Sequence, residues 1–180
     1  MTRDQLEHVI RAAATIADDD DIVVIGSQAI LGQFPDAPPG LLVSNEADVW
    51  PRNHPDRWEL IDGAIGELSL FHDTFGYYAQ GAGRETAVLP QNWENLLVRI
   101  STPATRGATG WCLEIHDLVV SGYVAGRERD AAFVSGVIAH GMVDESTLLE
   151  RLDATPVPAQ QRAVIAARIR EDFSAGRKER

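Results

Sequence analysis

Two acidic residues at positions 46 and 48 form the pattern in this sequence with the clearest chemical meaning. Glu46-Ala47-Asp48 lies in a mostly apolar stretch between Leu41 and Trp50. In a β-strand, residues i and i+2 project from the same face, so the two carboxylates would lie side by side. Two such anions repel each other unless a cation lies between them, and magnesium accepts carboxylate oxygens. The pair predicts a magnesium site for phosphoryl or nucleotidyl transfer. The alternative is an exposed edge strand with two solvated acids.

The dipeptide Gly26-Ser27 is a second candidate, as a site for a phosphate group. It follows Ile22–Ile25, which is β-branched throughout and therefore typical of a strand buried on both faces. Gln28–Gly32 then predicts a short helical turn. Unpaired amides and the positive end of a helix dipole attract phosphate, glycine permits close approach, and the serine hydroxyl adds a donor. An ordinary turn is the other interpretation of the same two residues.

A basic segment further along the chain is a third candidate. Gly126 precedes Arg127, Arg129 and Asp130, and these residues should begin a helix. Arg127 and Asp130 are three residues apart, so they can form a surface ion pair. They can equally bind a phosphate, with Asp130 orienting an arginine, because the planar guanidinium group binds two oxygens at once.

His116-Asp117 and Cys112 complete the set of candidates. Asp117 is most simply an acid in the first turn of a helix, where the helix dipole favours a negative charge. The other hypothesis gives His116 or Asp117 the role of a catalytic base. Cys112 is the only cysteine, and its apolar neighbours predict a buried hydrophobic side chain rather than a nucleophile.

The hydrophobic pattern predicts how these residues are positioned. It places helices at both ends of the chain and short strands between them, which indicates an α+β fold. Residues 1–110 would form a mixed core of strands and helices. Residues 111–180 would form a helical region packed on this core, so that the two make one compact unit. The predicted helices are 2–17, 56–71, 116–125, 127–140, 144–152 and 159–173. The predicted strands are 22–25, 46–50, 76–83, 85–89 and 96–101, with 76–89 as strands or a hairpin and 102–110 as a loop.

Composition restricts the partners and the compartment. The formal net charge is −11, which gives no global attraction to nucleic acid, so a small anion that carries its own magnesium is easier to accommodate than a long polyanion. A single cysteine excludes a disulfide within the chain and fits a reducing compartment. We see no signal peptide and no apolar run long enough to span a bilayer, so we expect a soluble, cytoplasmic protein.

Two of these motifs together resemble a known superfamily. Val24-Ile25-Gly26-Ser27 followed by Glu46-Ala47-Asp48-Val49 is similar to the signature of the nucleotidyltransferases related to DNA polymerase β. His116-Asp117-Leu118, the segment 125–130 and the stretch 61–78 resemble the AbiEii-type toxin and related uncharacterised bacterial nucleotidyltransferase-like proteins. The resemblance covers roughly residues 20–145.

The resemblance implies a fold, a reaction and a set of roles. The fold would be a small mixed sheet flanked by helices and followed by a helical half. Glu46 and Asp48 would bind Mg²⁺, and Ser27 would contact the triphosphate. An acceptor hydroxyl of RNA, a protein or a small molecule would attack the α-phosphate of a nucleoside triphosphate and release pyrophosphate. The likeness to toxins adds an antitoxin as an expected partner.

Two positions depart from the family pattern and define an alternative. The family supplies a third carboxylate from a following strand, where this chain has Gln80. The related toxins carry a lysine in the helix before the Gly-Arg segment, where this chain has Gly122. The alternative is a non-catalytic member of the fold that binds a nucleotide or a partner protein. A third hypothesis is an α+β protein in which Glu46 and Asp48 are merely exposed.

Overall fold

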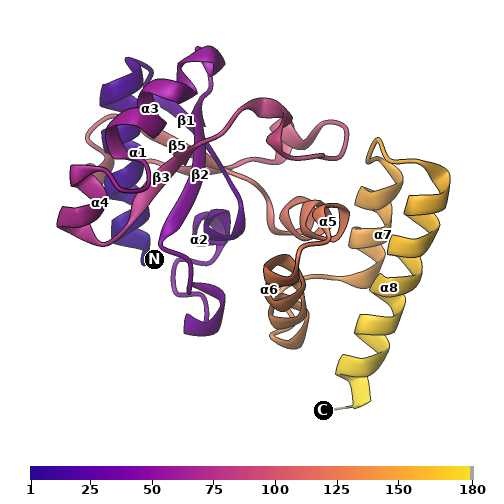
Figure 1. Ribbon diagram of the computed structural model, residues 1–180. Helices are drawn as coiled ribbons and strands as arrows, with labels where there is room; N and C mark the ends of the chain where they lie inside the picture. Colours follow the sequence, from indigo (N-terminus) through magenta and orange to yellow (C-terminus); the bar gives the residue numbers. More distant parts are fainter. Residues whose placement is uncertain (179–180) are drawn as a thin grey trace. The chain divides into compact units, whose positions relative to one another are not determined.

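The computed structural model describes residues 1–178 and has the α+β fold that the sequence predicts (Figure 1). The described residues form eight α-helices, five β-strands and several single turns of 3-10 helix. The helices are α1 (Arg3–Ala17), α2 (Ile30–Gln33), α3 (Trp58–Ile65), α4 (Leu70–Phe75), α5 (Ile115–Ala125), α6 (Glu128–Ala139), α7 (Glu145–Asp153) and α8 (Ala159–Lys178). The strands are β1 (Asp21–Ile25), β2 (Glu46–Pro51), β3 (Tyr78–Gly81), β4 (Val98–Ile100) and β5 (Thr109–Cys112).

The strands form one mixed sheet in the order β3-β2-β1-β5-β4. β1 is antiparallel to β2 and parallel to β5, while β2 is parallel to β3 and β4 is antiparallel to β5. Strand β1 therefore has a neighbour on each side, and Ile22–Ile25 are all buried, as the β-branched sequence predicts. Its last residue, Ile25, lies opposite Asp48 of β2, and this register brings the two predicted site motifs to the same part of the sheet.

Helices α1 and α3 contact each other and pack on the sheet (Figure 1). Ala47 and Val49 of β2 are completely buried, whereas Glu46 and Asp48 alternate with them and are half-buried. Because side chains alternate between the two faces of a strand, the acids project from the face opposite Ala47 and Val49. The period-two pattern of β2 thus separates core positions from candidate site positions.

Local sequence explains where helix α1 begins and ends. Thr2 caps its first turn through a reciprocal capping box with Gln5, and Leu6, Val9 and Ile10 are buried at helical spacing. Asp18 follows in the left-handed conformation and ends the helix. The next residue, Asp19, accepts hydrogen bonds from the backbone amides of Asp21, Asn53 and His54, so the acidic run joins the turn after β2 to the turn before β1.

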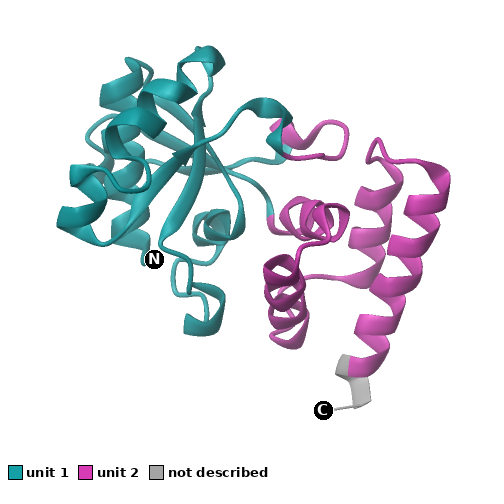
Figure 2. Cartoon of the chain, viewed as in Figure 1, with its two compact units in different colours: residues 1–86, 96–114 teal, residues 87–95, 115–180 magenta. Residues whose placement is uncertain are grey.

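The chain divides into two compact units (Figure 2). Unit 1 comprises residues 1–86 and 96–114 and contains the sheet with α1–α4. Unit 2 comprises residues 87–95 and the chain from residue 115 onward, and in it α5 packs on α6 and α7 while α8 packs on α6 and α7. The predicted regions 1–110 and 111–180 stay predictions, and residues 179–180 lie outside the described residues.

Three expected elements differ from the structure. The helix predicted over 56–71 is divided into α3 and α4, because Gly66 ends the first helix and Ser69 caps the second. Residues 85–89 form no strand, and part of this segment, from residue 87, belongs to unit 2. The loop predicted over 102–110 contains the start of β5, which the sheet stabilises by pairing it with β1 and β4.

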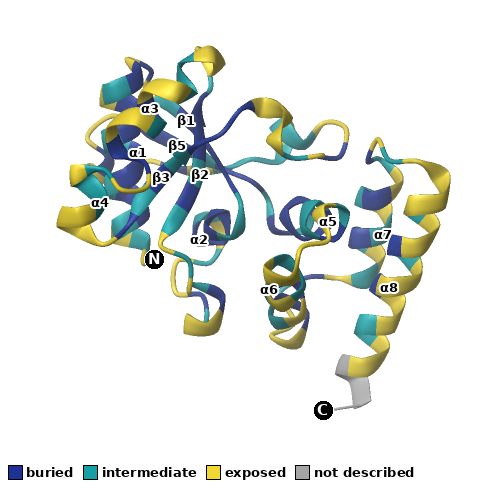
Figure 3. Ribbon diagram, in the orientation of Figure 1, coloured by how far each residue is buried: buried dark blue, intermediate teal, exposed yellow. Residues whose placement is uncertain are grey.

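Buried residues concentrate in the strands and on one side of each of the longer helices (Figure 3). In unit 2 the core is formed by Leu118 and Val119 of α5, Val137 of α6, Leu148 of α7 and Ile169 of α8, all nearly or completely buried. Within the part of the chain that the structure describes, no helix has both the length and the apolar character needed to cross a membrane.

Candidate functional site

The end of β1 is shaped around Gly26. Its φ angle is +70°, a conformation that side chains disfavour, and a Cβ atom at this position would collide with the Oδ2 atom of Asp48. The carboxylate of Asp48 therefore packs against the bare Cα of Gly26. This contact makes the predicted phosphate motif and the predicted metal motif neighbours in the sheet.

Ser27 follows in a single turn of 3-10 helix, Ser27–Ala29, that leads into α2. The Ser27 side chain is half-buried, and its Oγ atom accepts a hydrogen bond of 3.3 Å from Nε2 of the buried Gln28. Gln28 Oε1 in turn accepts from the amino group of Met1 at 3.2 Å. Because both helical pieces are short, the helix dipole at Ser27 is weak, and the hydroxyl is the stronger reason to consider this residue a phosphate ligand.

Glu46 and Asp48 project from the same face of β2, as their spacing predicts. Glu46 lies opposite Tyr78 of β3, whose hydroxyl donates a hydrogen bond of 3.2 Å to Glu46 Oε2. Tyr78 is a site residue that the sequence analysis missed. The same period-two rule could have indicated it, because Tyr78 and Gln80 are two residues apart and project from the same face of β3.

Burial and nearby negative charges both act on the Tyr78 hydroxyl. Burial raises the pKa of Tyr78 to about 12, and the charge of Glu46, its hydrogen bond, and the charges of Glu67 and Asp48 act in the same direction. A phenol with such a pKa stays protonated at neutral pH and acts as a donor. The site therefore combines a concentration of carboxylates with a neutral hydroxyl that serves one of them.

Gln80 lies opposite Asp48 in the register of β2 and β3. Its Nε2 atom donates to Asp62 Oδ1 of helix α3 at 2.7 Å, and the same oxygen accepts from the Gly81 amide at 3.3 Å. The position where the family supplies a third carboxylate is thus occupied by an amide that binds a different carboxylate. An acid in place of Gln80 would face Asp62 at hydrogen-bonding distance, where like charges repel.

The side chains present can be compared with what magnesium requires. Across residues 1–178, no group of three histidine, cysteine, aspartate or glutamate side chains is arranged to hold a metal ion. Magnesium, however, keeps several waters and is commonly bound through one or two carboxylates together with substrate phosphates. Glu46 and Asp48 supply that number of carboxylates on one face. The pair therefore fits an ion that arrives with a triphosphate better than an ion held by the protein alone.

Asp117, the predicted catalytic acid or base, lies in unit 2. It is completely buried in α5, and its Oδ1 atom is 3.5 Å from Nε of Arg151 in α7. Its neighbour His116 accepts a hydrogen bond from the Asp144 amide at the start of α7. Both residues therefore connect α5 to α7, and a catalytic role for Asp117 stays a prediction.

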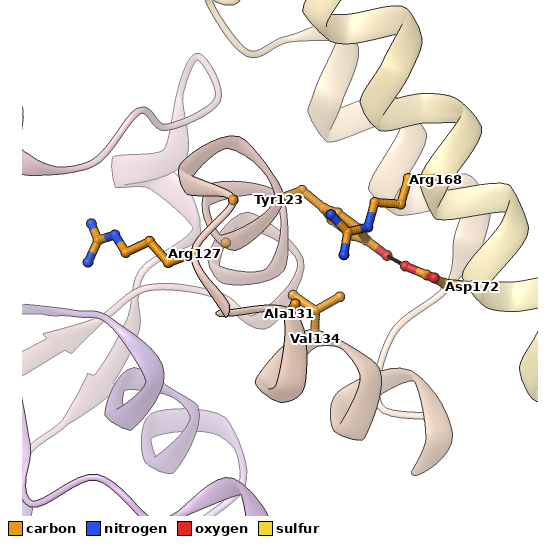
Figure 4. Close-up of a pocket in the computed structure, with 8 residues that line it drawn as sticks. Tyr123, Arg127, Ala131, Val134, Arg168 and Asp172 are labelled. Atoms are coloured by element: carbon orange, nitrogen blue, oxygen red, sulfur yellow. Dashed lines mark hydrogen bonds between the residues drawn. The ribbon is translucent and has the colours of Figure 1, made fainter. Parts of the chain in front are cut away.

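The predicted phosphate-binding arginines also lie in unit 2. Arg127 precedes α6 and forms the expected pair with Asp130, with Nε and Oδ2 3.8 Å apart, while Arg129 is exposed. Arg127 lines a narrow pocket between α5, α6 and α8, with room for about one water molecule (Figure 4). In that view the Arg127 side chain points away from Tyr123 and Asp172, which share a hydrogen bond of 2.7 Å.

Two other predictions concern Gly122 and Cys112. A Cβ atom at Gly122 would lie 3.3 Å from Val134 Cγ2, so α5 packs closely on α6 at this position. Cys112 is fully buried, and burial raises the pKa of its thiol to about 12. A thiol that stays protonated is a poor nucleophile, which agrees with the prediction of a buried hydrophobic side chain.

Comparison with known proteins tests the family. Residues 4–170 match a family model described as "Nucleotidyltransferase of unknown function (DUF6036)". No curated protein and no solved structure matches the chain. The resemblance to the AbiEii-type toxin is not confirmed by these comparisons. Since the matched segment spans most of both units, the chain belongs to this family of nucleotidyltransferases of unknown function.

Proposed function

We propose that this protein is a magnesium-dependent nucleotidyltransferase that moves a nucleoside monophosphate from a nucleoside triphosphate to an acceptor hydroxyl. One observation carries the proposal. The Asp48 carboxylate packs on Gly26, beside Ser27, and Glu46 projects from the same face of β2. A phosphate contact and a pair of metal-binding acids are thereby neighbours, as transfer of a nucleotidyl group requires.

Each residue has a defined task in this proposal. Glu46 and Asp48 hold the magnesium that accompanies the triphosphate, and Ser27 donates its hydroxyl to a phosphate oxygen. Magnesium, when bound, neutralises charge that accumulates on the phosphate oxygens during in-line attack. The bare Cα of Gly26 leaves room for the Asp48 carboxylate, so the metal-binding oxygens stay next to the phosphate contact. A phosphate-binding role for Arg127, Arg129 and Asp130 of unit 2 stays a prediction from the sequence.

The acceptor is an RNA end, a protein hydroxyl or a small molecule. The net charge of −11 disfavours a long polyanion unless a local basic surface meets it. A toxin-like role with an antitoxin partner stays a prediction from the sequence resemblance.

A second function deserves consideration because of Gln80. The neutral amide of Gln80 lies opposite Asp48 and donates a hydrogen bond to Asp62. A member of the fold without a third carboxylate lacks a group that would deprotonate the acceptor. Such a protein would bind a nucleotide, or a partner protein, without turning it over.

The two functions differ in turnover, so incubation with Mg²⁺, each labelled triphosphate and mixed acceptors separates them. We expect label transfer or pyrophosphate release, and a loss of about 100-fold or more in Asp48→Asn, which keeps the shape but removes the metal-binding charge. Asp36→Asn, at an exposed acid of unit 1, is the matched control and should behave like the unchanged protein. Magnesium-dependent nucleotide binding without turnover would support the non-catalytic function instead. Absence of both would contradict the proposal.

A further inference from the structure

Tyr78 makes the only contact that the structure specifies for a Glu46 side-chain oxygen within the described residues. Its hydroxyl donates to Glu46 Oε2 at 3.2 Å, and the register of the parallel strands β2 and β3 places the two residues directly opposite each other. A glutamate side chain has three rotatable bonds, so a half-buried Glu46 would otherwise sample several orientations. The hydrogen bond removes much of that freedom and fixes one carboxylate oxygen, which leaves the other available for a ligand.

Tyr78 is itself held by helix α4. The imidazole ring of His72 packs on the Tyr78 ring, with a centroid separation of 4.6 Å. His72 is in turn oriented by two backbone contacts, since the Leu68 amide donates to its Nδ1 atom at 3.2 Å and its own amide donates to Ser69 Oγ. A continuous set of contacts thus connects the start of α4 to the Glu46 carboxylate.

We propose that Tyr78, supported by His72, is a positioning residue that orients Glu46 for magnesium. The inference rests on the proposed function and extends it to residues that no family motif assigns. Hydrogen-bonded partners of metal-binding carboxylates contribute to metal affinity by holding the ligand in its binding orientation. A neutral donor also suits this site, because it restrains Glu46 without adding a third negative charge next to Asp48.

The variant Tyr78→Phe tests the inference, because it removes one hydroxyl and keeps the ring that packs on His72. Magnesium is titrated into protein mixed with a non-hydrolysable triphosphate analogue, and nucleotide binding is followed by calorimetry. We expect the magnesium concentration at half-saturation to rise roughly 10- to 100-fold, the range found when such partners of metal ligands are removed. Binding of the analogue without magnesium should not change.

Tyr77→Phe is the matched control. Tyr77 is the adjacent residue, but its hydroxyl bonds His8 Nδ1 of helix α1 at 2.7 Å rather than Glu46. The control loses the same atom one position away, so it reports any general effect of removing a buried hydroxyl. We expect its magnesium dependence to equal that of the unchanged protein. Circular dichroism and the thermal midpoint of each variant establish that it is folded.

A double-mutant cycle distinguishes positioning from a purely structural role. If Tyr78 acts through Glu46, Tyr78→Phe should have little further effect on magnesium dependence once Glu46→Gln is present. Additive effects of the two changes, or an unchanged half-saturation in Tyr78→Phe alone, would overturn the inference and leave the proposed function intact. Lack of magnesium-dependent nucleotide binding in the unchanged protein would instead contradict the proposed function, and with it this inference.

Discussion

At the scale of single residues, Gly26 has the strictest requirement in the candidate site. Its positive φ angle disfavours a side chain, and an added Cβ atom would also require the Asp48 carboxylate to shift. Neither feature follows from the dipeptide Gly26-Ser27 alone. The φ angle depends on the turn after β1, and the contact with Asp48 depends on the register of Ile25 with Asp48. The sequence therefore indicated that a glycine could matter here, and the structure explains why a side chain at this position would be strained.

Gly26→Ala should consequently lower the stability of the protein. We expect a loss of about 1–3 kcal/mol in the free energy of unfolding, because alanine is strained at this φ angle and its methyl group must displace Asp48. Urea denaturation followed by circular dichroism measures the change. Gly40→Ala is the control, since Gly40 has open space around its Cα and no positive φ angle, and it should change stability by less than about 0.5 kcal/mol. Equal stability of the two variants would show that the Gly26 turn tolerates a side chain.

The site also shows what sequence patterns at the residue scale can predict. The i and i+2 spacing of Glu46 and Asp48 predicted correctly that they share a face of one strand. Pairing between strands cannot be read from such spacing, so the hydrogen bond from Tyr78 to Glu46 and the amide pair of Gln80 with Asp62 were missed. Long-range register is a property of the folded sheet and is only indirectly encoded in local sequence.

At the scale of secondary-structure elements, the predictions succeeded where a segment is long and periodic. Helix α1 was found because its cap and its buried stripe are both local signals. Strand β5 was missed because Thr109–Cys112 is short and contains Gly110, and its strand conformation depends on β1 and β4 on either side. Tertiary pairing therefore overrode a weak local preference.

Helices α1 and α4 are joined by an aromatic cluster whose stability should depend on pH. His8 contacts the rings of Phe71, Phe75 and Tyr77, and burial lowers its pKa from 6.5, with the positive charge of Arg11 acting in the same direction. Below pH 6.5 the unfolded chain binds a proton at His8 more readily than the folded protein does. Stability contributed by neutral His8 is therefore present above pH 6.5 and is lost as the pH falls through the lower, folded pKa.

Urea denaturation at a series of pH values from about 7.5 to 5 checks this prediction. We expect the free energy of unfolding to decrease toward acid pH, and we expect His8→Gln, which does not titrate, to flatten the dependence. His140→Gln changes an exposed histidine and should retain the original slope. Asp19 also has a lowered pKa, because hydrogen bonds outweigh the effect of its burial, but it starts from 3.8 and therefore acts below this range. An identical slope in His8→Gln would exclude His8 as the cause.

Helices α5 and α7 are joined by the ion pair of Asp117 and Arg151. The Asp117 side chain is completely buried and that of Arg151 is one quarter exposed. Arg151→Met should leave a buried carboxylate without this cation and lower the free energy of unfolding by about 3 kcal/mol. Arg129→Met, at an exposed arginine of the same unit, should have little effect. If Arg151→Met proved as stable as this control, the ion pair with Asp117 would not contribute to the stability of unit 2.

At the scale of the whole molecule, the candidate residues are divided between the two units. Gly26, Ser27, Glu46 and Asp48 belong to unit 1, whereas Asp117 and the segment 127–130 belong to unit 2. The family match extends from residue 4 to residue 170 and so includes both. The α+β class and the nucleotidyltransferase family could be predicted from the sequence, because hydrophobic periodicity and the two short motifs are local features. The division of residues 87–95 into unit 2 could not, because it depends on contacts such as that of the Gln91 amide with the Ala154 carbonyl.

The order of strands in the sheet has a consequence for the synthesis of the protein. β1 and β2 emerge early from the ribosome and pair with each other, but the other neighbour of β1 is β5, which is made much later. Until Thr109–Cys112 has left the exit tunnel, one edge of the apolar strand Asp21–Ile25 lacks its native partner. Unpaired apolar edges promote aggregation of nascent chains. The nascent chain is thus most prone to aggregation between the emergence of β1 and the emergence of β5, which completes the sheet by joining β1 to β4.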